Sequence, residues 1–286
     1  MYHYLDFKGD LFNKGDLYKM VTIGFNSNKG GNCTTTSVIE VATALKVYGY
    51  RVLVIDTDSQ LSLTKNITDP DELDNVLSKP SIFTALKGEC SMEEAIQHTK
   101  FFDLVIGSQG LDRADKEFAE RDDVFLLSDL LSFVADDYDF TVIDSGPAKN
   151  FIQTSLLIAS DYIILNCEID ASNYDAVITT EQELKKLVEG RNHDSHAKVM
   201  GYIIPRFENI NIAKIIYEDV DEHRKERMAE TGEDIFLRTI PKSKDMSENK
   251  SLKTASCLSA KSSKCARAYF DVADEIIRIT GFKKGE

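Results

Sequence analysis

The sequence predicts an α/β fold with a doubly wound, mostly parallel sheet flanked by helices. Short apolar runs rich in β-branched residues alternate with longer segments whose apolar residues recur at helical spacing. Some of these runs end in aspartate, at the strand end where open α/β sheets place their ligands. The chain has 286 residues, 42% of them apolar, which is enough for a large core. We predict one domain over residues 20–286, preceded by an N-terminal extension over 1–19.

The first half of this domain begins with an apolar, β-rich strand over 20–25, Met-Val-Thr-Ile-Gly-Phe. A glycine-containing loop follows, and the helical spacing of the next apolar residues predicts a helix that ends near Gly49. Residues 64–80 contain two X-Pro pairs and are predicted as a surface loop with a short helix. A helical region is predicted over 111–135. Further apolar runs predict strands at 51–55, 102–107 and 140–143.

The second half continues the alternation. Apolar runs predict strands over 162–165 and 198–204, with a helix over 174–189 between them. A charged helix is predicted over 211–230 and a final helix over 265–280. The apolar face of the final helix consists of Tyr269, Val272, Ala273, Ile276 and Ile277.

Residues 28–37, Asn-Lys-Gly-Gly-Asn-Cys-Thr-Thr-Thr-Ser, lie between the first strand and the first helix, where a phosphate-binding loop would lie. The usual loop reads Gly, four residues, then Gly-Lys-Ser/Thr. Aligned on Thr35, this chain has Asn28, Cys33 and Thr34 at the positions of the two glycines and the lysine. The loop alone is compatible with a nucleotide site or with an ordinary strand-to-helix turn.

Two later strands end in carboxylates. The run over 51–55 continues into Asp56-Thr57-Asp58-Ser59-Gln60, and the run over 140–143 continues into Asp144-Ser145-Gly146-Pro147. The second arrangement resembles a Walker B aspartate, which holds Mg²⁺ in nucleotide sites. One such aspartate could be a helix cap or a turn residue. Two carboxylate-ended strands after a glycine-rich loop favour the nucleotide site.

Together these motifs resemble the ParA/MinD group of deviant Walker A ATPases, which are P-loop NTPases, and most closely the ParA-type DNA-partition proteins. The likeness rests on Lys-Gly-Gly with its threonine run, Val-Leu-Val-Ile-Asp-Thr-Asp-Ser-Gln and Val-Ile-Asp-Ser-Gly-Pro. It extends from about Met20 through Ile240-Pro241 to the final helix. The combined pattern is specific, although each part alone is not.

The resemblance implies a role for each matching position and ATP or ADP with Mg²⁺ as cofactors. Lys29 matches the signature lysine that reaches the partner's nucleotide across a dimer interface. Thr35 matches the Mg²⁺ hydroxyl ligand, Asp58 the carboxylate that serves water activation, and Asp144 the Walker B residue. The implied catalytic residues are Lys29, Asp58 and Asp144, and the implied metal residues are Thr35, Asp58 and Asp144. The implied nucleotide contacts are Asn28, Lys29, Gly30, Gly31, Asn32, Cys33, Thr34, Thr35, Thr36 and Pro241.

The departures from the family pattern predict a weakened site. Thr34 replaces a lysine whose charge-assisted hydrogen bonds to phosphate are worth about 1.5–3 kcal/mol each. By analogy with oxyanion-hole losses, its absence costs on the order of 10²–10³ in rate. Cys33 adds a side chain where the backbone needs a positive φ or a close approach to phosphate. Ser59 replaces the family's proline. We expect weak nucleotide binding and very slow or absent hydrolysis, unless Lys29 compensates.

Charge is distributed unevenly. The net charge of −14 opposes general nucleic-acid affinity, yet residues 235–267 hold eight cationic and two acidic side chains, a local charge of +6. A solvated lysine-bearing loop would also produce this pattern. ParA-like proteins bind DNA without sequence specificity near this region, so the resemblance implies phosphate-backbone contacts here. The candidate DNA-binding residues are Arg238, Lys242, Lys244, Lys250, Lys253, Lys261, Lys264 and Arg267.

Composition excludes several other classes. No run of 18 apolar residues predicts a membrane span, and the N-terminus lacks the pattern of a secretory signal. The five cysteines are scattered, without the Cys-x-x-Cys spacing of a zinc site, and are typical of reduced thiols in a cytoplasmic protein. The C-terminal residues 271–286 are a poor match to the basic amphipathic helix of a MinD-like membrane-surface ATPase, which ranks that class last without excluding it.

Three functions remain in order of preference. The first is an ATP-switched homodimer that binds DNA non-specifically, serves plasmid or chromosome partition, associates with the nucleoid and responds to a centromere-binding, ParB-like adaptor. The second is a degenerate relative that binds DNA or a partner without hydrolysing ATP. The third is a MinD-like positioning ATPase. No membrane partner is predicted for the preferred function.

Overall fold

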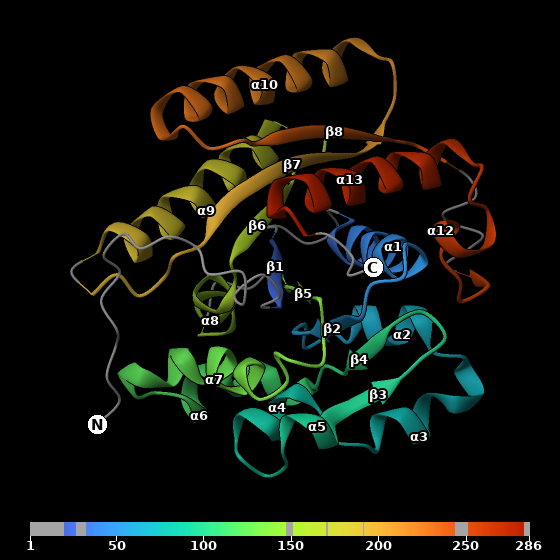
Figure 1. Ribbon diagram of the computed structural model, residues 1–286, viewed down its shortest axis with the longest axis vertical. Coiled ribbons are helices and arrows are strands. Elements are labelled where there is room, and N and C mark those ends of the chain that lie inside the picture. The colour runs from blue at the N-terminus through green and yellow to red at the C-terminus, as the bar shows by residue number, and fades with distance from the viewer. Residues whose placement is uncertain are drawn as a thin grey trace.

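The computed structural model describes residues 20–26, 33–146, 151–169, 171–190, 192–243 and 251–282, so the predicted extension over 1–19 lies outside the described residues. An eight-stranded sheet with the strand order β3-β4-β2-β5-β1-β6-β7-β8 forms the centre of the fold (Figure 1). Its strands are β1 (Val21–Asn26), β2 (Val52–Asp56), β3 (Ile96–His98), β4 (Asp103–Val105), β5 (Phe140–Asp144), β6 (Tyr162–Asn166), β7 (Lys198–Phe207) and β8 (Phe236–Pro241).

The sheet is mostly parallel, as predicted. Each neighbouring pair from β4 to β8 runs parallel, and β3 alone pairs antiparallel with β4. The chain leaves β1 toward β2 on one side and later places β6 on the other side of β1. This reversal of strand order at β1 creates a crevice at the carboxyl ends of the strands, where doubly wound folds bind ligands.

Helices cover both faces of the sheet (Figure 1). One face packs against α1 (Thr34–Val47), α12 (Ser256–Ser259) and α13 (Lys264–Thr280), whose buried side chains share one hydrophobic cluster with alternate residues of the strands. The second cluster lies on the other face of the sheet. The helices on this side include α4 (Ile82–Leu86), α5 (Met92–Ala95), α6 (Ala114–Glu117), α7 (Leu126–Ser132), α8 (Phe151–Ala159), α9 (Ala171–Glu189) and α10 (Asn211–Thr231).

Several predicted elements differ in detail. The helical region predicted over 111–135 is divided into two 3₁₀ segments, Gln109–Arg113 and Arg121–Phe125, and the short helices α6 and α7. The predicted loop over 64–80 contains the end of α2 (Ser62–Ile67), a 3₁₀ turn and α3 (Leu73–Leu77). Edge strands β3 and β8 and helix α8 were not predicted. Among the described helices, none is long and apolar enough to cross a membrane.

Candidate functional site

The strand register brings the carboxylate-ended strands together. Asp56 is the last residue of β2 and Asp144 the last of β5, and these two residues are direct partners in the parallel ladder. On its other side Asp144 is paired with Phe25, near the end of β1. Cys33 lies at the N-terminus of α1, and in the sequence the predicted loop connects it to the end of β1. The structure therefore places both aspartates at the strand ends that border the predicted phosphate-binding loop.

Asp144 is fully buried and only half of its carboxylate is satisfied. The hydroxyl of Thr35, in the first turn of α1, donates to Oδ2 at 2.8 Å. Oδ1 has no hydrogen-bond partner among the described residues. Burial raises the pKa of the Asp144 carboxyl well above its ordinary value, and the nearby negative charge of Asp56 raises it further. A cation beside a buried carboxylate with a raised pKa would favour its charged form and lower that pKa.

Three more buried polar groups lack partners at the same edge. The amide nitrogen Nδ2 of Asn26, the hydroxyl of Thr34 and the hydroxyl of Ser145 have no hydrogen-bond partner within the described ranges. They lie at the end of β1, the start of α1 and the residue after β5. Buried polar groups are normally satisfied, so four of them at one edge of the sheet are compatible with a site that binds an ion or a polar ligand.

Asp56 shapes the loop that follows β2. Its Oδ1 accepts the backbone N–H of Asp58 at 3.1 Å, and its Oδ2 accepts the N–H and the hydroxyl of Thr64 at 2.9 and 2.6 Å. Burial raises the pKa of Asp56 to about 6, although these hydrogen bonds oppose the rise. No role was predicted for Asp56, because its contacts with Thr64 and Asp58 come from the folded loop. The sequence signal that could have identified Asp56 was its place at the end of a predicted strand.

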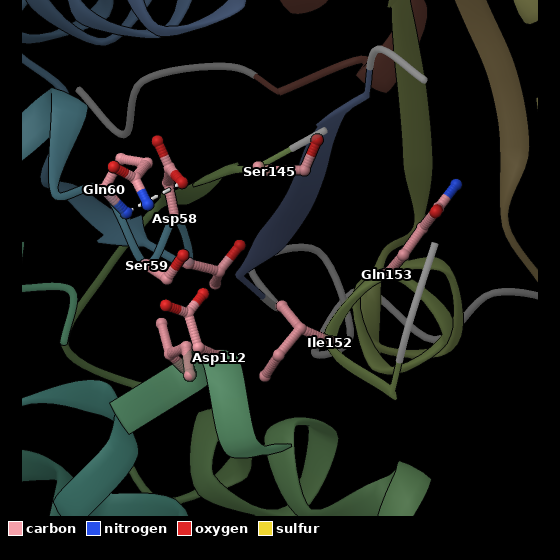
Figure 2. Close-up of a pocket in the computed structure, with 10 residues that line it drawn as sticks. Asp58, Ser59, Gln60, Asp112, Ser145, Ile152 and Gln153 are labelled. Carbon is pink, nitrogen blue, oxygen red and sulfur yellow. Dashed lines mark hydrogen bonds between the residues drawn. The ribbon is translucent and has the colours of Figure 1, made fainter. Parts of the chain in front are cut away.

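Asp58 lines a cavity of about 140 Å³ between the β2 loop, the 3₁₀ segment at 109–113 and the start of α8 (Figure 2). One of its oxygens accepts the N–H of Gln60 at 3.0 Å. Thr57 joins this loop to β5, because its N–H and its hydroxyl both donate to the carbonyl of Asp144, at 3.0 and 2.6 Å. The other lining residues include Ser59, Asp112, Ser145, Gly146, Ile152 and Gln153.

The start of α1 shows the effect of the two loop replacements. Cys33 is the N-cap residue and has φ 54°, a left-handed conformation that favours glycine. The expectation that this position needs a positive φ is therefore confirmed. Thr34 is 7% exposed, so the side chain that replaces the family's lysine is buried. Thr36, the other predicted nucleotide contact in this turn, is partly buried.

The next turn of α1 is bonded to the C-terminal helices. The buried Ser37 hydroxyl lies 3.2 Å from the Tyr269 hydroxyl of α13 and accepts the side-chain amide of Asn166 at 2.9 Å. The carboxylate of Glu40 accepts the backbone N–H groups of Ser256 and Cys257, at 2.7 and 2.9 Å. Because Glu40 is 3% exposed, its charge is held by these two bonds at the start of α12. The helix that begins at the candidate phosphate loop is thus fixed directly to α12 and α13.

The donor set fits a magnesium ion. Mg²⁺ prefers oxygen ligands and is usually held by one or two carboxylates, a hydroxyl, water and substrate phosphates. Thr35 and Asp144 offer a hydroxyl and a carboxylate whose Oδ1 has no partner within the described ranges. No group of three or more His, Cys, Asp and Glu side chains that could hold a metal occurs among the described residues. Any ion would therefore depend on phosphate and water for its remaining ligands.

Some predicted contacts lie outside the described residues, namely Asn28, Lys29, Gly30, Gly31 and Asn32. Their roles stay predictions. Pro241 ends β8, at the same edge of the sheet as the aspartates but three strands away from β1.

The eight predicted DNA-binding residues divide into three groups. Lys244 and Lys250 lie outside the described ranges. Three others already have partners: Arg238 pairs with Glu275, Lys242 with Glu208 at 2.9 Å, and the amine of Lys253 donates to the carbonyl of Lys65 at 2.7 Å. The remaining three have exposed side chains that form no hydrogen bond or ion pair within the described part of the chain. These are Lys261, Lys264 and Arg267, around the start of α13.

Comparisons with known proteins match the part of the chain that carries the candidate nucleotide site. A family model described as an AAA domain matches residues 20–196. A ParA family protein of Chlamydia pneumoniae is 35% identical over 159 residues, which are 51% of this chain and 58% of that protein. A chromosome partitioning protein ParA of Myxococcus xanthus is 26% identical over 262 residues, 90% of this chain and 87% of that protein. The chain thus spans less than two thirds of the chlamydial relative.

Solved structures share the fold. A putative plasmid partition protein of Borrelia burgdorferi B31, bound to AMPPNP, superposes with a TM-score of 0.74 at 20% identity, covering 91% of this chain and 99% of that one. Cobyrinic acid a,c-diamide synthase of Mycobacterium smegmatis, with bound ADP and magnesium, gives 0.72 at 22% identity, covering 91% and 94%. These neighbours hold nucleotide, and one of them holds magnesium, on the same architecture.

Proposed function

Since the chain belongs to the AAA domain family matched over 20–196 and is a ParA-like P-loop ATPase in sequence and fold, we propose that it acts as a DNA-partition switch. In this proposal ATP with Mg²⁺ promotes a homodimer, the dimer binds DNA without sequence specificity, and a centromere-binding, ParB-like adaptor controls release. The expected location is the cytoplasm, on the nucleoid. Cargo could be a plasmid or a chromosome.

One observation supports the nucleotide site above all others. Four buried polar groups, on Asn26, Thr34, Asp144 and Ser145, lack partners among the described residues at the strand ends beside the loop. A metal–phosphate group at this edge would supply the partners that these groups lack.

The residues would divide the work as follows. Thr35 and Asp144 would hold the magnesium ion, which neutralises phosphate charge when bound. Asp58 would orient the attacking water, since its loop is fixed by Asp56 and Thr57. Lys29 would supply the cation that position 34 lacks, from the partner subunit. Loop N–H groups at the start of α1 would contact the phosphates.

The DNA surface would be the exposed group Lys261, Lys264 and Arg267, extended by Lys244 and Lys250. α1 offers a physical route from nucleotide to this surface, because its first turn carries Thr35 and its second is bonded to α12 and α13. A change in the position of α1 would therefore shift the elements that carry the cations. Direct contacts of α1 therefore link the candidate nucleotide site to the proposed DNA surface.

A second function has its own supporting observation. Thr34 is buried and its hydroxyl has no partner within the described ranges, so this position supplies no charge to a phosphate. A relative that binds nucleotide, DNA or a partner but does not hydrolyse ATP would retain the carboxylates and lose this lysine. The partition switch hydrolyses ATP and the degenerate relative does not, whereas nucleotide binding is compatible with both.

The deciding experiment measures three properties of the native chain: ATP affinity with and without Mg²⁺, oligomeric state, and binding to random duplex DNA at low and moderate salt. We expect Mg²⁺-dependent ATP binding, a nucleotide-dependent dimer and salt-sensitive DNA binding. Replacing Lys261, Lys264 and Arg267 by glutamate should weaken DNA binding and reduce its salt slope by about 3. The matched control, Lys242→Glu, alters a cation that is already paired with Glu208. No response of oligomeric state to ATP would contradict the switch.

A further inference from the structure

The outer face of α10 exposes a row of large apolar side chains. Ile210, which precedes the helix, is 49% exposed, Ile212 is 48% exposed and Ile215 is 52% exposed. The inward face of the same segment is complete without them, because Ala213, Ile216 and Val220 are buried against the protein. In Figure 1, α10 is drawn as the outermost helix beside β7 and β8. These isoleucines therefore contribute little to the core of this chain.

The C-terminal half of α10 is fixed by buried polar contacts. The carboxylate of Glu181, on α9, lies 2.8 Å from Nε2 of His223 and 3.5 Å from the guanidinium of Arg227, and it accepts the Tyr202 hydroxyl. Arg224 donates to the carbonyl of Ile235 at 3.1 Å, just before β8. The helix is thus held in place from its far end, and its first turns are free to present a surface.

Unpaired carboxylates lie beside the isoleucines. Glu218, Asp219 and Glu222 are exposed, and their carboxylates form no hydrogen bond or ion pair within the described part of the chain. Residues 212, 215, 219 and 222 are spaced by three, four and three, so two isoleucines and two carboxylates share one stripe of the helix. Lys214 is the single cationic residue in the sequence from 208 to 222. The first half of α10 therefore offers an apolar patch followed by an acidic one.

We infer that this stripe, Ile212-Ile215-Asp219-Glu222, with Ile210 at its end, is a docking surface for a basic amphipathic segment of a protein partner. Exposed apolar groups beside acidic ones match a helix or strand that presents apolar residues next to lysine or arginine. The acidic half repels DNA and anionic lipid, which distinguishes this surface from the cationic one around α13. The inference does not depend on nucleotide, because no atom of the candidate nucleotide site takes part.

The test uses the full chain and a fluorescein-labelled synthetic peptide of 15 residues, built from leucine, lysine and alanine with the leucines along one helical face. Binding is followed by fluorescence anisotropy. We expect Ile212→Ser with Ile215→Ser to raise the Kd by about tenfold or more, since replacing central apolar anchors by a small uncharged residue removes a major part of the binding energy. Asp219→Lys with Glu222→Lys should raise the Kd by a similar factor and reduce its dependence on salt.

Matched controls separate this surface from general attraction to an acidic protein. Phe133→Ser changes another exposed apolar side chain, which is 69% exposed, on the C-terminal side of α7. Glu230→Lys changes an exposed carboxylate at the far end of α10. Both should leave the Kd within about twofold of the native value. Circular dichroism and the unfolding midpoint verify that each variant is folded.

Three results would overturn the proposal. The first is a Kd for the double isoleucine variant that equals the native Kd. The second is a loss as large in the Phe133→Ser control. The third is native self-association that the isoleucine substitutions abolish, because a second copy of the chain would then be the occupant. A version of the peptide with glutamate in place of lysine should bind at least tenfold more weakly, and equal binding would remove the charge argument.

Discussion

The two sides of the candidate nucleotide site differ sharply. On the side of β2 and β5, the side chains of Asp56, Thr57 and Asp144 are buried. Thr57 donates to the carbonyl of Asp144, Asp56 accepts the N–H of Asp58, and the Asp144 carboxylate accepts the hydroxyl of Thr35 on α1. On the loop side, Cys33 has a left-handed backbone and Thr34 a buried hydroxyl without a partner among the described residues. On the carboxylate side Asp58 and Asp144 stand where the resemblance expects them and Ser59 departs from it, whereas the described loop side departs at Cys33 and Thr34.

This difference separates two tasks that P-loop sites usually combine. Holding a metal requires oxygen ligands at the strand ends, and Thr35 with Asp144 offers them. Stabilising the charge of phosphoryl transfer requires a cation at the loop, and position 34 offers none. We infer that metal-dependent nucleotide binding survives better than hydrolysis. Substitutions on the loop side and on the carboxylate side should therefore change hydrolysis and metal-dependent binding separately.

The largest effect is expected from Thr34→Lys, which restores the cation to the loop side. Turnover of ATP should rise by about 10²–10³, because a preorganised cation would act on the phosphates in the transition state. The measurement is steady-state ATP hydrolysis with and without DNA. Thr34→Met is the matched control, since it adds length without charge and should give no gain. Native turnover that Thr34→Lys does not improve would show that another group already supplies this charge.

The second effect comes from Asp144→Asn, which alters the carboxylate side. The variant should lose the Mg²⁺-dependent part of ATP affinity, by about 10- to 100-fold, because interactions with a charged partner are worth about 1.5–3 kcal/mol. Isothermal titration of ATP with Mg²⁺ and with EDTA measures this difference. An unchanged effect of Mg²⁺ would place the metal elsewhere.

The same substitution should change stability with pH in the nucleotide-free protein. Burial raises the pKa of Asp144 in the folded state, so the folded chain holds a proton that the unfolded chain releases near the ordinary aspartate value. The contribution of Asp144 to native stability should therefore fall as pH rises above about 4. Asp144→Asn lacks this term and should lose less stability between pH 4.5 and 7.5. Denaturant unfolding in EDTA at several pH values compares the two, and parallel curves would contradict the raised pKa.

The sequence predicted the central part of this fold well because that part depends on local pattern. Strands β1, β2, β5, β6 and β7 are apolar runs, and α1 and α13 have strong helical spacing. The edge strands were missed for a physical reason. β3 has three residues and exists through its antiparallel pairing with β4, and β8 contains Arg238 and ends in a proline. Such strands are defined by their neighbours more than by their own residues.

The candidate site shows the same division. Thr35 and Asp144 were predicted from motifs, and their hydrogen bond confirms that these positions meet. The roles of Asp56 and Glu40 were not predicted, because each depends on backbone N–H groups brought to it by folding. The basic segment was predicted from composition, but composition could not show that Glu275 and Glu208 already pair with two of its cations.

The smallest effect should come from Cys33→Gly, on the loop side again. A non-glycine residue in a left-handed conformation costs about 1–2 kcal/mol, while glycine costs about 0.5–1 kcal/mol in unfolded-chain entropy, so the free energy of unfolding should rise by about 1 kcal/mol or less. Denaturant unfolding measures this change. Cys33→Ala is the control, because it removes the thiol and keeps the Cβ atom, and it should give no such gain. An equal gain in both variants would assign the effect to the thiol. A gain in Cys33→Gly alone would show that the loop side carries backbone strain at residue 33 as well as lacking the lysine.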